Sequence, residues 1–447
     1  MTVTSGANDG NDVAALRALA SAEMRERRYD EAIAALERVA ALGPDAGVHA
    51  DLASCHYWGG RLEPALLEAR AALALEPGRA GTLLLMAAVL HGLGRHDEAL
   101  RAALEAVRLE PANDTACARA GSILERLGRL PEAEAQFRRA EELAAGKPYS
   151  LVTFDSRVLG ALTAWRKDLV AAPVHRYGPR EGGGHELVVL ACCDAAYLAR
   201  YGYNFVSSFA HNAARNALLH VHVIDPAADL DRTIERLTRD LPPAELLVTT
   251  EDSPFSGKAV GVAAHTYYAC CRFLQLPGLL ARHRKPIVCL DIDAIIEQPL
   301  QALVASGAGG DVILTRREPS HSPWLDIQAG LVVANATAGA ARYFELVRDY
   351  ILYFMSRRQF KWHLDQAALY CVFSVLERYG DPGRGLLQRW LERLLPAIAP
   401  RLLQAPRVTW LPSSADAPVW QIGHSHTRRH EDPRVTRYSP AAAEAPR

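Results

Sequence analysis

The chain has 447 residues, of which 49% are hydrophobic and 23% are charged, so it is globular and too long for one ordinary core. Fifty basic residues nearly balance 51 acidic ones, which argues against a surface built generally for nucleic acid or anionic membranes. The N-terminal residues do not read as a secretory signal, and no apolar run reaches the roughly 18 residues of a membrane span. The eight cysteines form no Cys-x-x-Cys pair, so we expect no structural zinc site and a cytoplasmic protein.

The first third of the chain repeats with a period of about 34 residues. Small residues and turn glycines recur at this step: Ala32, Ala65, Ala99 and Ala133, with Gly60, Gly94 and Gly128. Pro44, Pro77 and Pro111 close three of the units. This pattern resembles the tetratricopeptide repeat over residues 13–145. The resemblance implies helix pairs that stack into an α-helical solenoid with a concave groove.

The resemblance also indicates which side chains would line the groove. The expected residues are Ser54, Tyr57, Leu84, Ala88, His91, Ser122 and Glu125. They lack the cationic clamp with which some repeat proteins hold a carboxylate, so we expect a largely neutral groove for a protein or peptide. The alternative is that the repeats only dimerise or cap the rest of the chain.

Residues 146–185 are predicted to be a linker. A helix is possible around residues 156–171, and the glycines of 178–185 are typical of a flexible connection. This glycine-rich stretch lacks the Lys-Ser/Thr ending of a nucleotide P-loop.

From residue 186 the pattern changes to short apolar strands separated by helical stretches. Strands are predicted at 186–193, 218–225, 245–250, 286–293, 311–316 and 328–335, and helices at 204–215, 231–240, 266–282, 338–355 and 364–378. The alternation predicts a mixed, mostly parallel sheet with helices on both faces, so the whole chain is α followed by α/β. Ligands bind such sheets at the carboxyl ends of the strands.

Two aspartates end the strand predicted at residues 286–293. Asp291 and Asp293 stand two positions apart, so on a strand both carboxylates would face one way while Ile292 points into the core. Two carboxylates suit a hard cation such as Mn²⁺ or Mg²⁺. A second Asp-x-Asp, Asp229 to Asp231, precedes a predicted helix and is better explained as a cap.

The sequence around these aspartates resembles glycosyltransferase family 8 and its relatives of the GT-A fold over residues 186–430. The stretches that carry the resemblance are YYACCRFLQLPGLL, PIVCLDIDAII, CDAAY, IQAGLVVAN, HLDQAAL and IGHSHTRR. Their order along the chain is more specific than any one of them. Residues 431–447 are expected to be a disordered tail.

The resemblance implies a role for each matching residue. Asp291 and Asp293 would bind the metal, helped by His424 or His426. Residues that would bind the nucleotide-sugar are Asp194, Tyr197, Arg272, Gln328 and Gly330, and the catalytic pair would be Asp365 and Gln366. Gln328 replaces an asparagine of the family, and Arg428 or Arg429 stands in for its final lysine.

Each of these residues has a structural alternative. Asp291 and Asp293 could belong to an ordinary turn, and Arg272 could form a surface ion pair. Asp194 could cap the next helix, Tyr197 could pack in the core, and Asp365 could be a helix N-terminal charge. Gln328 with Gly330 could start an ordinary strand, and the two histidines could lie in a solvated segment.

The sequence therefore predicts a metal-dependent glycosyltransferase that transfers a sugar from a nucleoside diphosphate, with UDP the expected nucleotide. The resemblance implies retention of anomeric configuration, although no inverting base can be named or excluded. The acceptor would be a protein, a peptide or a glycan. The alternative is a repeat-based scaffold or binding protein whose donor-like domain is inactive.

Overall fold

The computed structural model describes residues 6–26, 28–144, 170–179, 184–213, 216–240, 245–257, 261–316, 327–356, 360, 363–379, 406–412 and 419–421. The chain divides into two compact units, one made of Met1–Val152 with Glu318–Asp326 and one made of the remainder. Among the described residues, no helix has both the length and the apolar character to cross a membrane.

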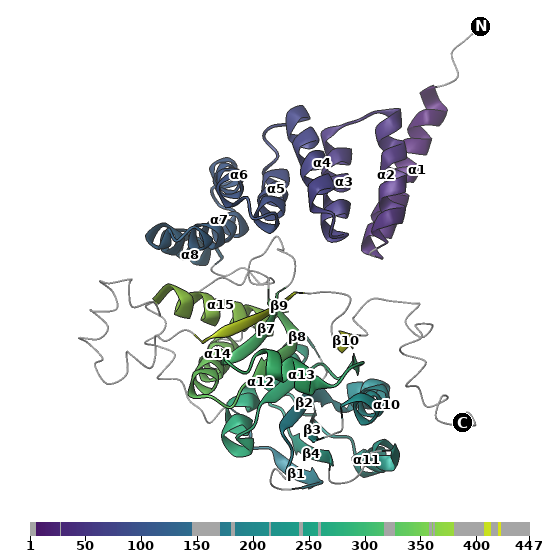
Figure 1. The fold of residues 1–447 in the computed structure, drawn as a ribbon. Helices are drawn as coiled ribbons and strands as arrows, with labels where there is room; N and C mark the ends of the chain where they lie inside the picture. Colours follow the sequence, from purple (N-terminus) through teal and green to yellow (C-terminus); the bar gives the residue numbers. More distant parts are fainter. Residues whose placement is uncertain are drawn as a thin grey trace. The chain divides into compact units, whose positions relative to one another are not determined.

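The first unit is built from consecutive helices, and each packs against the next along the chain (Figure 1). In order they are α1 (Gly6–Arg25), α2 (Tyr29–Leu42), α3 (Ala46–Trp58), α4 (Leu62–Leu75), α5 (Ala80–Gly92), α6 (His96–Leu109), α7 (Asp114–Arg126) and α8 (Leu130–Ala144). The predicted helical solenoid is confirmed.

The repeated small residues explain how these helices approach each other. The four repeat alanines from Ala32 to Ala133 are fully buried. The repeat glycines Gly60, Gly94 and Gly128 follow α3, α5 and α7 with φ of +75°, +73° and +71°. This left-handed conformation favours glycine, and it turns the chain into the second helix of each pair.

Several residues expected on the concave face have another role. Tyr57, Leu84 and Ala88 belong to the hydrophobic core of the solenoid and Ser122 is also buried, so the prediction of a groove lined by all seven residues was wrong. The physical reason is that α3, α5 and α7 are packed by helices on both sides. Ser54, His91 and Glu125 are only partly buried.

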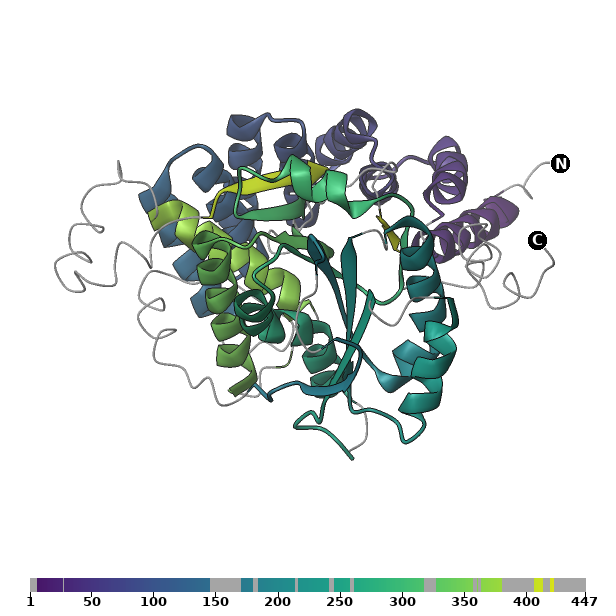
Figure 2. The same cartoon turned by 60° about the horizontal axis from the view of Figure 1, so that its bottom comes forward.

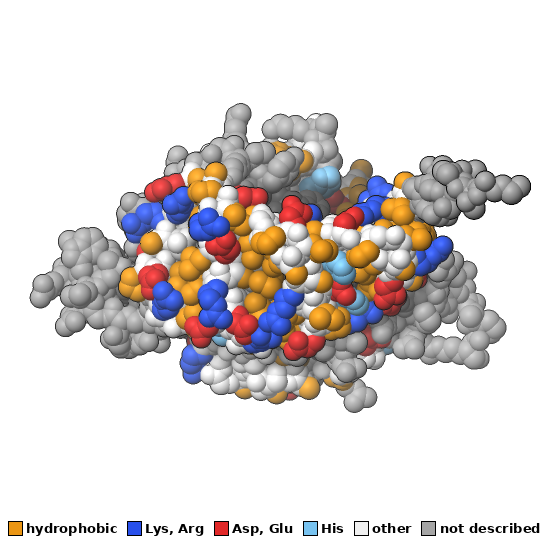
Figure 3. Space-filling view, turned by 90° about the horizontal axis from the view of Figure 1, so that it is seen from above, with side chains coloured by type: hydrophobic (Ala, Val, Ile, Leu, Met, Phe, Trp, Pro, Cys, Tyr) orange, Lys and Arg blue, Asp and Glu red, His pale blue; other side chains and the backbone are white. Residues whose placement is uncertain are grey.

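One face of the repeat unit carries charges of both signs. Figure 3, seen from above the view of Figure 1, shows basic and acidic side chains interspersed with apolar ones. Several are paired three residues apart, as in Arg95–Glu98, Arg108–Glu105 and Arg129–Glu132. Such exposed pairs contribute little to stability, and they leave no strong field of one sign on this face.

The second unit contains an eight-stranded mixed sheet in the order β1-β4-β3-β2-β5-β8-β7-β9. Its strands are β1 (Val174–Tyr177), β2 (Leu187–Asp194), β3 (Ala217–Ile224), β4 (Leu246–Glu251), β5 (Ile287–Leu290), β7 (Val312–Arg316), β8 (Ile327–Ala334) and β9 (Val408–Pro412). Strands β4, β3, β2 and β5 are parallel, whereas β8 runs antiparallel to both β5 and β7. A smaller antiparallel pair joins β6 (Ala294–Ile296) to β10 (Val419–Gln421).

Helices cover both faces of the large sheet (Figure 2). On one side lie α10 (Ala195–Asn212) and α11 (Leu230–Leu237), and on the other lie α12 (Val262–His283), α14 (Ala338–Ser356) and α15 (Leu364–Tyr379). The short α13 (Leu300–Ser306) and the 3-10 turn η2 (Thr238–Asp240) complete the described helices. The predicted mixed sheet with helices on both faces is confirmed.

Alternate residues of the strands give the two faces of the sheet different characters. The face toward α10 and α11 is apolar, with Val189, Val221 and Val248 in one core cluster with Phe205 and Ile234. The alternate positions face α12 and include several buried polar side chains, as the period of two along a strand requires.

The region predicted as a linker contains a strand. Residues 174–177 form the edge strand β1, which pairs antiparallel with β4, so the sheet unit begins before the predicted residue 186. A short edge strand is hard to recognise because its half-exposed side chains show little apolar signal. The possible helix at 156–171 falls almost wholly outside the described residues, and the expected tail at 431–447 lies entirely outside them.

A glycine substitution tests the turn geometry of the repeats. A Cβ at Gly94 would meet nothing within 4 Å, so the cost of Gly94→Ala comes from the positive φ alone. We expect a loss of about 1 kcal/mol in the local stability of α5 and α6, measured by amide hydrogen exchange. Gly81→Ala is the matched control, because Gly81 has equal space without a positive φ and should lose no stability. Equal effects at both positions would contradict this account.

Candidate functional site

Those predicted site residues that the structure describes gather at one edge of the sheet, where β2 and β5 end and β8 passes in the opposite direction. Ala191 of β2 pairs with Leu290, the last residue of β5, so the residues that follow β5 emerge beside the last three residues of β2. The backbone N–H of Asp291 donates to the carbonyl of Gly330 on β8, at 3.4 Å. Three segments widely separated in the sequence therefore meet here, at the carboxyl ends of parallel strands.

Asp291 and Asp293 lie in a turn and not on a strand, which corrects the prediction. Strand β5 ends at Leu290, and the N–H of Ala294 donates to the Asp291 carbonyl at 3.1 Å, which closes the turn into β6. Ile292 is buried in the core, as expected. The strand is shorter than predicted because residues 291–293 form the turn that leads into β6. The side chain of Asp291 is 33% exposed, whereas Asp293 is buried.

Arg272 on α12 joins two of the predicted residues. Its Nη1 donates to Oδ1 of Asp291, and its Nη2 donates to Oδ2 of Asp365 at 3.1 Å. The arginine side chain is only 6% exposed, so the surface ion pair considered for it is ruled out. Burial lowers the pKa of Arg272, but the carboxylates of Asp291 and Asp365 outweigh this effect and raise it, so the guanidinium stays charged.

Asp365 and Gln366 lie in the first turn of α15. The Asp365 carboxylate accepts from the backbone N–H of Gln366 at 2.9 Å, which is a helix N-terminal contact as well as an ion pair with Arg272. The Gln366 amide lies 3.3 Å from Nδ1 of His363. Residue His363 has a φ of +63°, so the turn before the helix is tight at this point.

Asp194 caps a helix, in agreement with its structural alternative. Its Oδ1 accepts from the backbone N–H of Tyr197 at 2.7 Å at the start of α10. Tyr197 is 38% exposed and is therefore not a core residue. Its ring lies against Tyr201, and partial burial, Tyr201 and the nearby Asp293 raise its pKa. Tyr197 can thus present an aromatic surface to solvent close to the aspartates.

Gln328 and Gly330 are both on β8. Gly330 contacts Asp291 through its carbonyl, and Gln328 is partly buried opposite Thr315 of β7. The bulge between Leu314 and Thr315 shifts the register of these strands beside Gln328. A strand assignment for this pair is confirmed, and its position beside Asp291 remains compatible with binding.

Two carboxylates at this edge are candidate ligands for a hard divalent cation. Asp291 and Asp293 provide carboxylate oxygens, but within the described part of the chain no third histidine, cysteine or acidic side chain completes a three-ligand set around them. Mg²⁺ and Mn²⁺ commonly use one or two protein carboxylates together with phosphate oxygens and water, so the two aspartates fit such an ion. His424 and His426 lie outside the described residues.

A polar cluster beside the predicted residues was missed by the sequence analysis. The Asp225 carboxylate, after β3, accepts from the N–H and hydroxyl of Ser253 at 2.8 and 2.6 Å and from the Tyr268 hydroxyl at 3.1 Å. Burial and Asp225 raise the pKa of Tyr268 to about 12. The sequence feature that could have identified this cluster is Asp225 itself, an acidic residue that follows an apolar run at the end of a predicted strand.

A pocket of about 360 Å³ lies at the opposite edge of the sheet. Its lining includes Leu187 at the start of β2, Pro286 before β5 and Asn335 after β8. Leu187 and Pro286 lie at the amino ends of parallel strands, whereas ligands of such sheets bind at the carboxyl ends.

Comparison with known proteins identifies the first unit. The family model of the tetratricopeptide repeat matches residues 17–80 and 84–148. Together with the observed helix pairs, this match makes the first unit a tetratricopeptide repeat domain. A search of curated proteins found no match.

Several solved structures match the chain over about a third of its length. A crystal structure of MamA has a TM-score of 0.30 and 25% identity, and the match covers 31% of this chain and 82% of that one. YrrB, described as a TPR protein with an unusual peptide-binding site, has a TM-score of 0.28 and 17% identity, covering 30% and 70% of the two chains. PilF of Pseudomonas aeruginosa has a TM-score of 0.29 and 22% identity, covering 32% and 65%.

Removing the buried guanidinium should destabilise the second unit. Arg272→Met leaves the Asp365 carboxylate buried without a counter-charge, and breaking such a pair costs about 3 kcal/mol or more in unfolding free energy. Burial already raises the pKa of Asp365 against the opposing effect of Arg272, and the variant should raise it further. A carboxyl whose pKa is raised by folding stabilises the fold most at low pH, so the deficit should shrink towards about pH 4.

Urea unfolding at two pH values measures this effect. Arg282→Met, at an exposed position of the same helix, is the control and should change stability by less than about 0.5 kcal/mol. A deficit that is the same at both pH values would exclude the buried carboxyl as its cause.

Proposed function

We propose that the second unit is a metal-dependent glycosyltransferase that uses a nucleoside-diphosphate sugar, with UDP as the nucleotide. The observation that carries the proposal is the convergence of Arg272, Asp291, Gly330 and Asp365 at one sheet edge. These residues come from four different segments of the chain, and a resemblance in sequence alone does not require them to meet.

The order of the strands supports a donor site at this edge. Asp194 ends β2, Asp291 follows β5 and Asp225 follows β3, so three carboxyl ends of adjacent parallel strands carry acidic residues. A GT-A-like fold would place the nucleotide over these ends. In this proposal the aromatic ring of Tyr197, which is partly exposed, packs against the nucleotide, and Arg272 positions the acidic residues.

A divalent cation would be held by Asp291 and Asp293 and would balance the charge of the departing nucleoside diphosphate. The protein contributes the placement of these carboxylates. Arg272 fixes Asp291 through Oδ1, and the Asp291 side chain is 33% exposed, so a ligand can approach its carboxylate. Arg272 also fixes Asp365 near the same point, where Asp365 and Gln366 would face the sugar and the acceptor.

The repeat domain would bind the acceptor. Tetratricopeptide helix pairs form extended surfaces that bind proteins or peptides. We propose that the first unit binds a protein or peptide partner, which would make a polypeptide the preferred acceptor over a free glycan. Retention of configuration follows only from the family resemblance.

A second candidate is a binding protein without turnover. The repeat match favours it, since the first unit is a scaffold of known type. The ion pair of Asp291 with Arg272 would also be compatible with a site in which the acidic residues hold the fold together and bind no metal. This candidate predicts folded protein that turns over no donor.

Hydrolysis of a donor in the absence of acceptor separates the two candidates. With Mn²⁺ and a panel of UDP-sugars, we expect slow release of UDP that stops when the metal is chelated. Asp291→Asn should lower the rate by roughly 100-fold or more, because the charge on the leaving group is no longer balanced.

The matched control is Asp229→Asn in the exposed second Asp-x-Asp, which should retain the full rate. No UDP release with any donor from folded protein would support the scaffold instead. Retained activity in Asp291→Asn would reject the assignment of this aspartate.

A further inference from the structure

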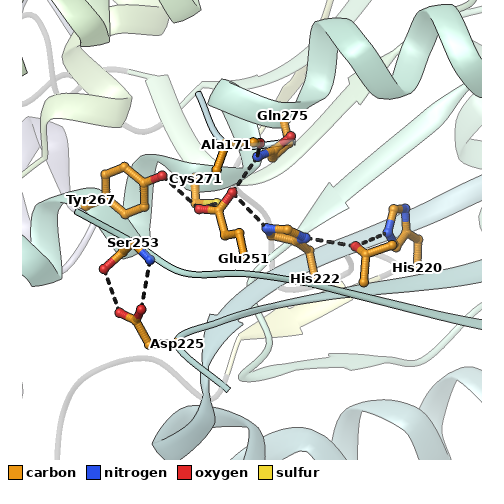
Figure 4. Close-up of polar contacts among 10 residues, drawn as sticks. Ala171, His220, His222, Asp225, Glu251, Ser253, Tyr267, Cys271 and Gln275 are labelled. Atoms are coloured by element: carbon orange, nitrogen blue, oxygen red, sulfur yellow. Dashed lines mark hydrogen bonds and ion pairs between the residues drawn. The ribbon is translucent and has the colours of Figure 1, made fainter. Parts of the chain in front are cut away.

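A second polar cluster is buried between the sheet and α12, on the face away from the apolar core (Figure 4). It contains His220 and His222 of β3 and Glu251 at the end of β4. From α12 come Tyr267, Cys271 and Gln275, which are spaced four residues apart and therefore share one face of the helix. None of these residues belongs to the proposed donor site.

The carboxylate of Glu251 is at the centre of this cluster. Its Oε1 accepts from the Tyr267 hydroxyl at 2.8 Å and from Sγ of Cys271 at 3.3 Å. Its Oε2 accepts from Nε2 of Gln275 at 2.5 Å and lies 3.2 Å from Nε2 of His222. The carboxylate is completely buried, so its charge has to be balanced inside the cluster.

The imidazole of His222 is oriented by a second contact. Its Nδ1 lies 2.8 Å from Oγ1 of Thr249, and the same hydroxyl oxygen lies 2.8 Å from Nε2 of His220. This chain of contacts holds the ring so that Nε2 faces Glu251 and Cys271. The side chain is 1% exposed, yet Nε2 has no hydrogen-bond partner of acceptable geometry, because Oε2 of Glu251 is near but off its axis.

A bound metal would explain why His222 Nε2 and Glu251 Oε2 lie close together but are not aligned for a hydrogen bond. Two ligand atoms of a tetrahedral zinc site lie roughly 3.4 Å apart, and neither points at the other because both point at the ion. The nitrogen, carboxylate oxygen and sulfur of His222, Glu251 and Cys271 all lie within 4.8 Å of one another. A hydrogen bond, in contrast, requires the donor to point at the acceptor.

We propose that His222, Glu251 and Cys271 form a buried Zn²⁺ site that fixes α12 to strands β3 and β4. Imidazole, carboxylate and thiolate are the ligand types that zinc prefers, and water would complete four-coordination. One thiolate and one carboxylate neutralise the ion, so the buried site carries no net charge. The Thr249 contact is the outer hydrogen bond that orients a zinc-bound histidine.

The position of the site gives the zinc a structural role. Cys271 directly precedes Arg272, so a metal bound to Cys271 restricts the helical turn that carries the arginine. The site is independent of the proposed transferase activity, since its ligands include a thiol and an imidazole, whereas the aspartates of the donor site suit a hard cation.

The test measures zinc in the full chain prepared without a histidine tag. After removal of metal with a chelator, addition of Zn²⁺ and dialysis, elemental analysis should find about one zinc per chain. Cys271→Ser should lower the zinc content at least about tenfold. The matched control Cys270→Ser changes the adjacent, equally buried cysteine and should keep the zinc. Asp291→Asn should keep it too.

Two further measurements guard against a variant that fails to fold. Co²⁺ added to the metal-free wild type should give thiolate-to-metal absorption, and Thr249→Val, which keeps all three ligands, should weaken zinc binding roughly tenfold. The proposal is overturned if the wild type retains no zinc or if Cys271→Ser binds as much as the wild type. A disulfide between Cys271 and Cys192, whose thiols interact, would also overturn it.

Discussion

The buried guanidinium of Arg272 is the contact on which the geometry of the candidate site depends. It holds Asp291 from the turn after β5 and Asp365 from the start of α15, two segments that have no covalent reason to meet. Two carboxylates this close would repel each other without the cation between them. The arginine therefore sets both the charge and the spacing of the site.

The packing of helices on the two faces of the sheet determines the position of Arg272. One face of the strands is apolar and packs on α10 and α11, which fixes the register of the parallel strands. The other face carries polar side chains that meet α12, so this helix is held by hydrogen bonds as well as by packing. In the repeat domain, buried small residues and positive-φ glycines bring successive helices together.

The sequence was sufficient for elements with a strong periodic or apolar signal. The repeat helices followed from the 34-residue spacing of the glycines, and the buried strands followed from their apolar runs. It missed β1, whose side chains are half exposed, and it placed Asp291 and Asp293 on a strand that in fact ends at Leu290. Both errors arise because hydrogen bonding to a neighbouring segment decides where a strand begins or ends, and spacing along the chain does not record this.

The candidate site, too, could be predicted from the sequence only in part. Asp291 and Asp365 could be proposed from local motifs, but their connection through Arg272 depends on how three segments fold together. The cluster of His222, Glu251 and Cys271 has no metal-binding spacing in the sequence, and only the packing of α12 on the sheet brings it together. Residues that only the tertiary structure brings together are not marked by a regular spacing in the sequence.

Calorimetric titration of UDP into the full chain tests the central claim most directly, because binding is measured without any knowledge of the acceptor. The account predicts that UDP binds in the presence of Mn²⁺, and that omission of the metal or the Asp291→Asn substitution abolishes the binding heat. If folded protein gives no heat with UDP and Mn²⁺, or binds UDP equally without the metal, the proposed role of this sheet edge is contradicted.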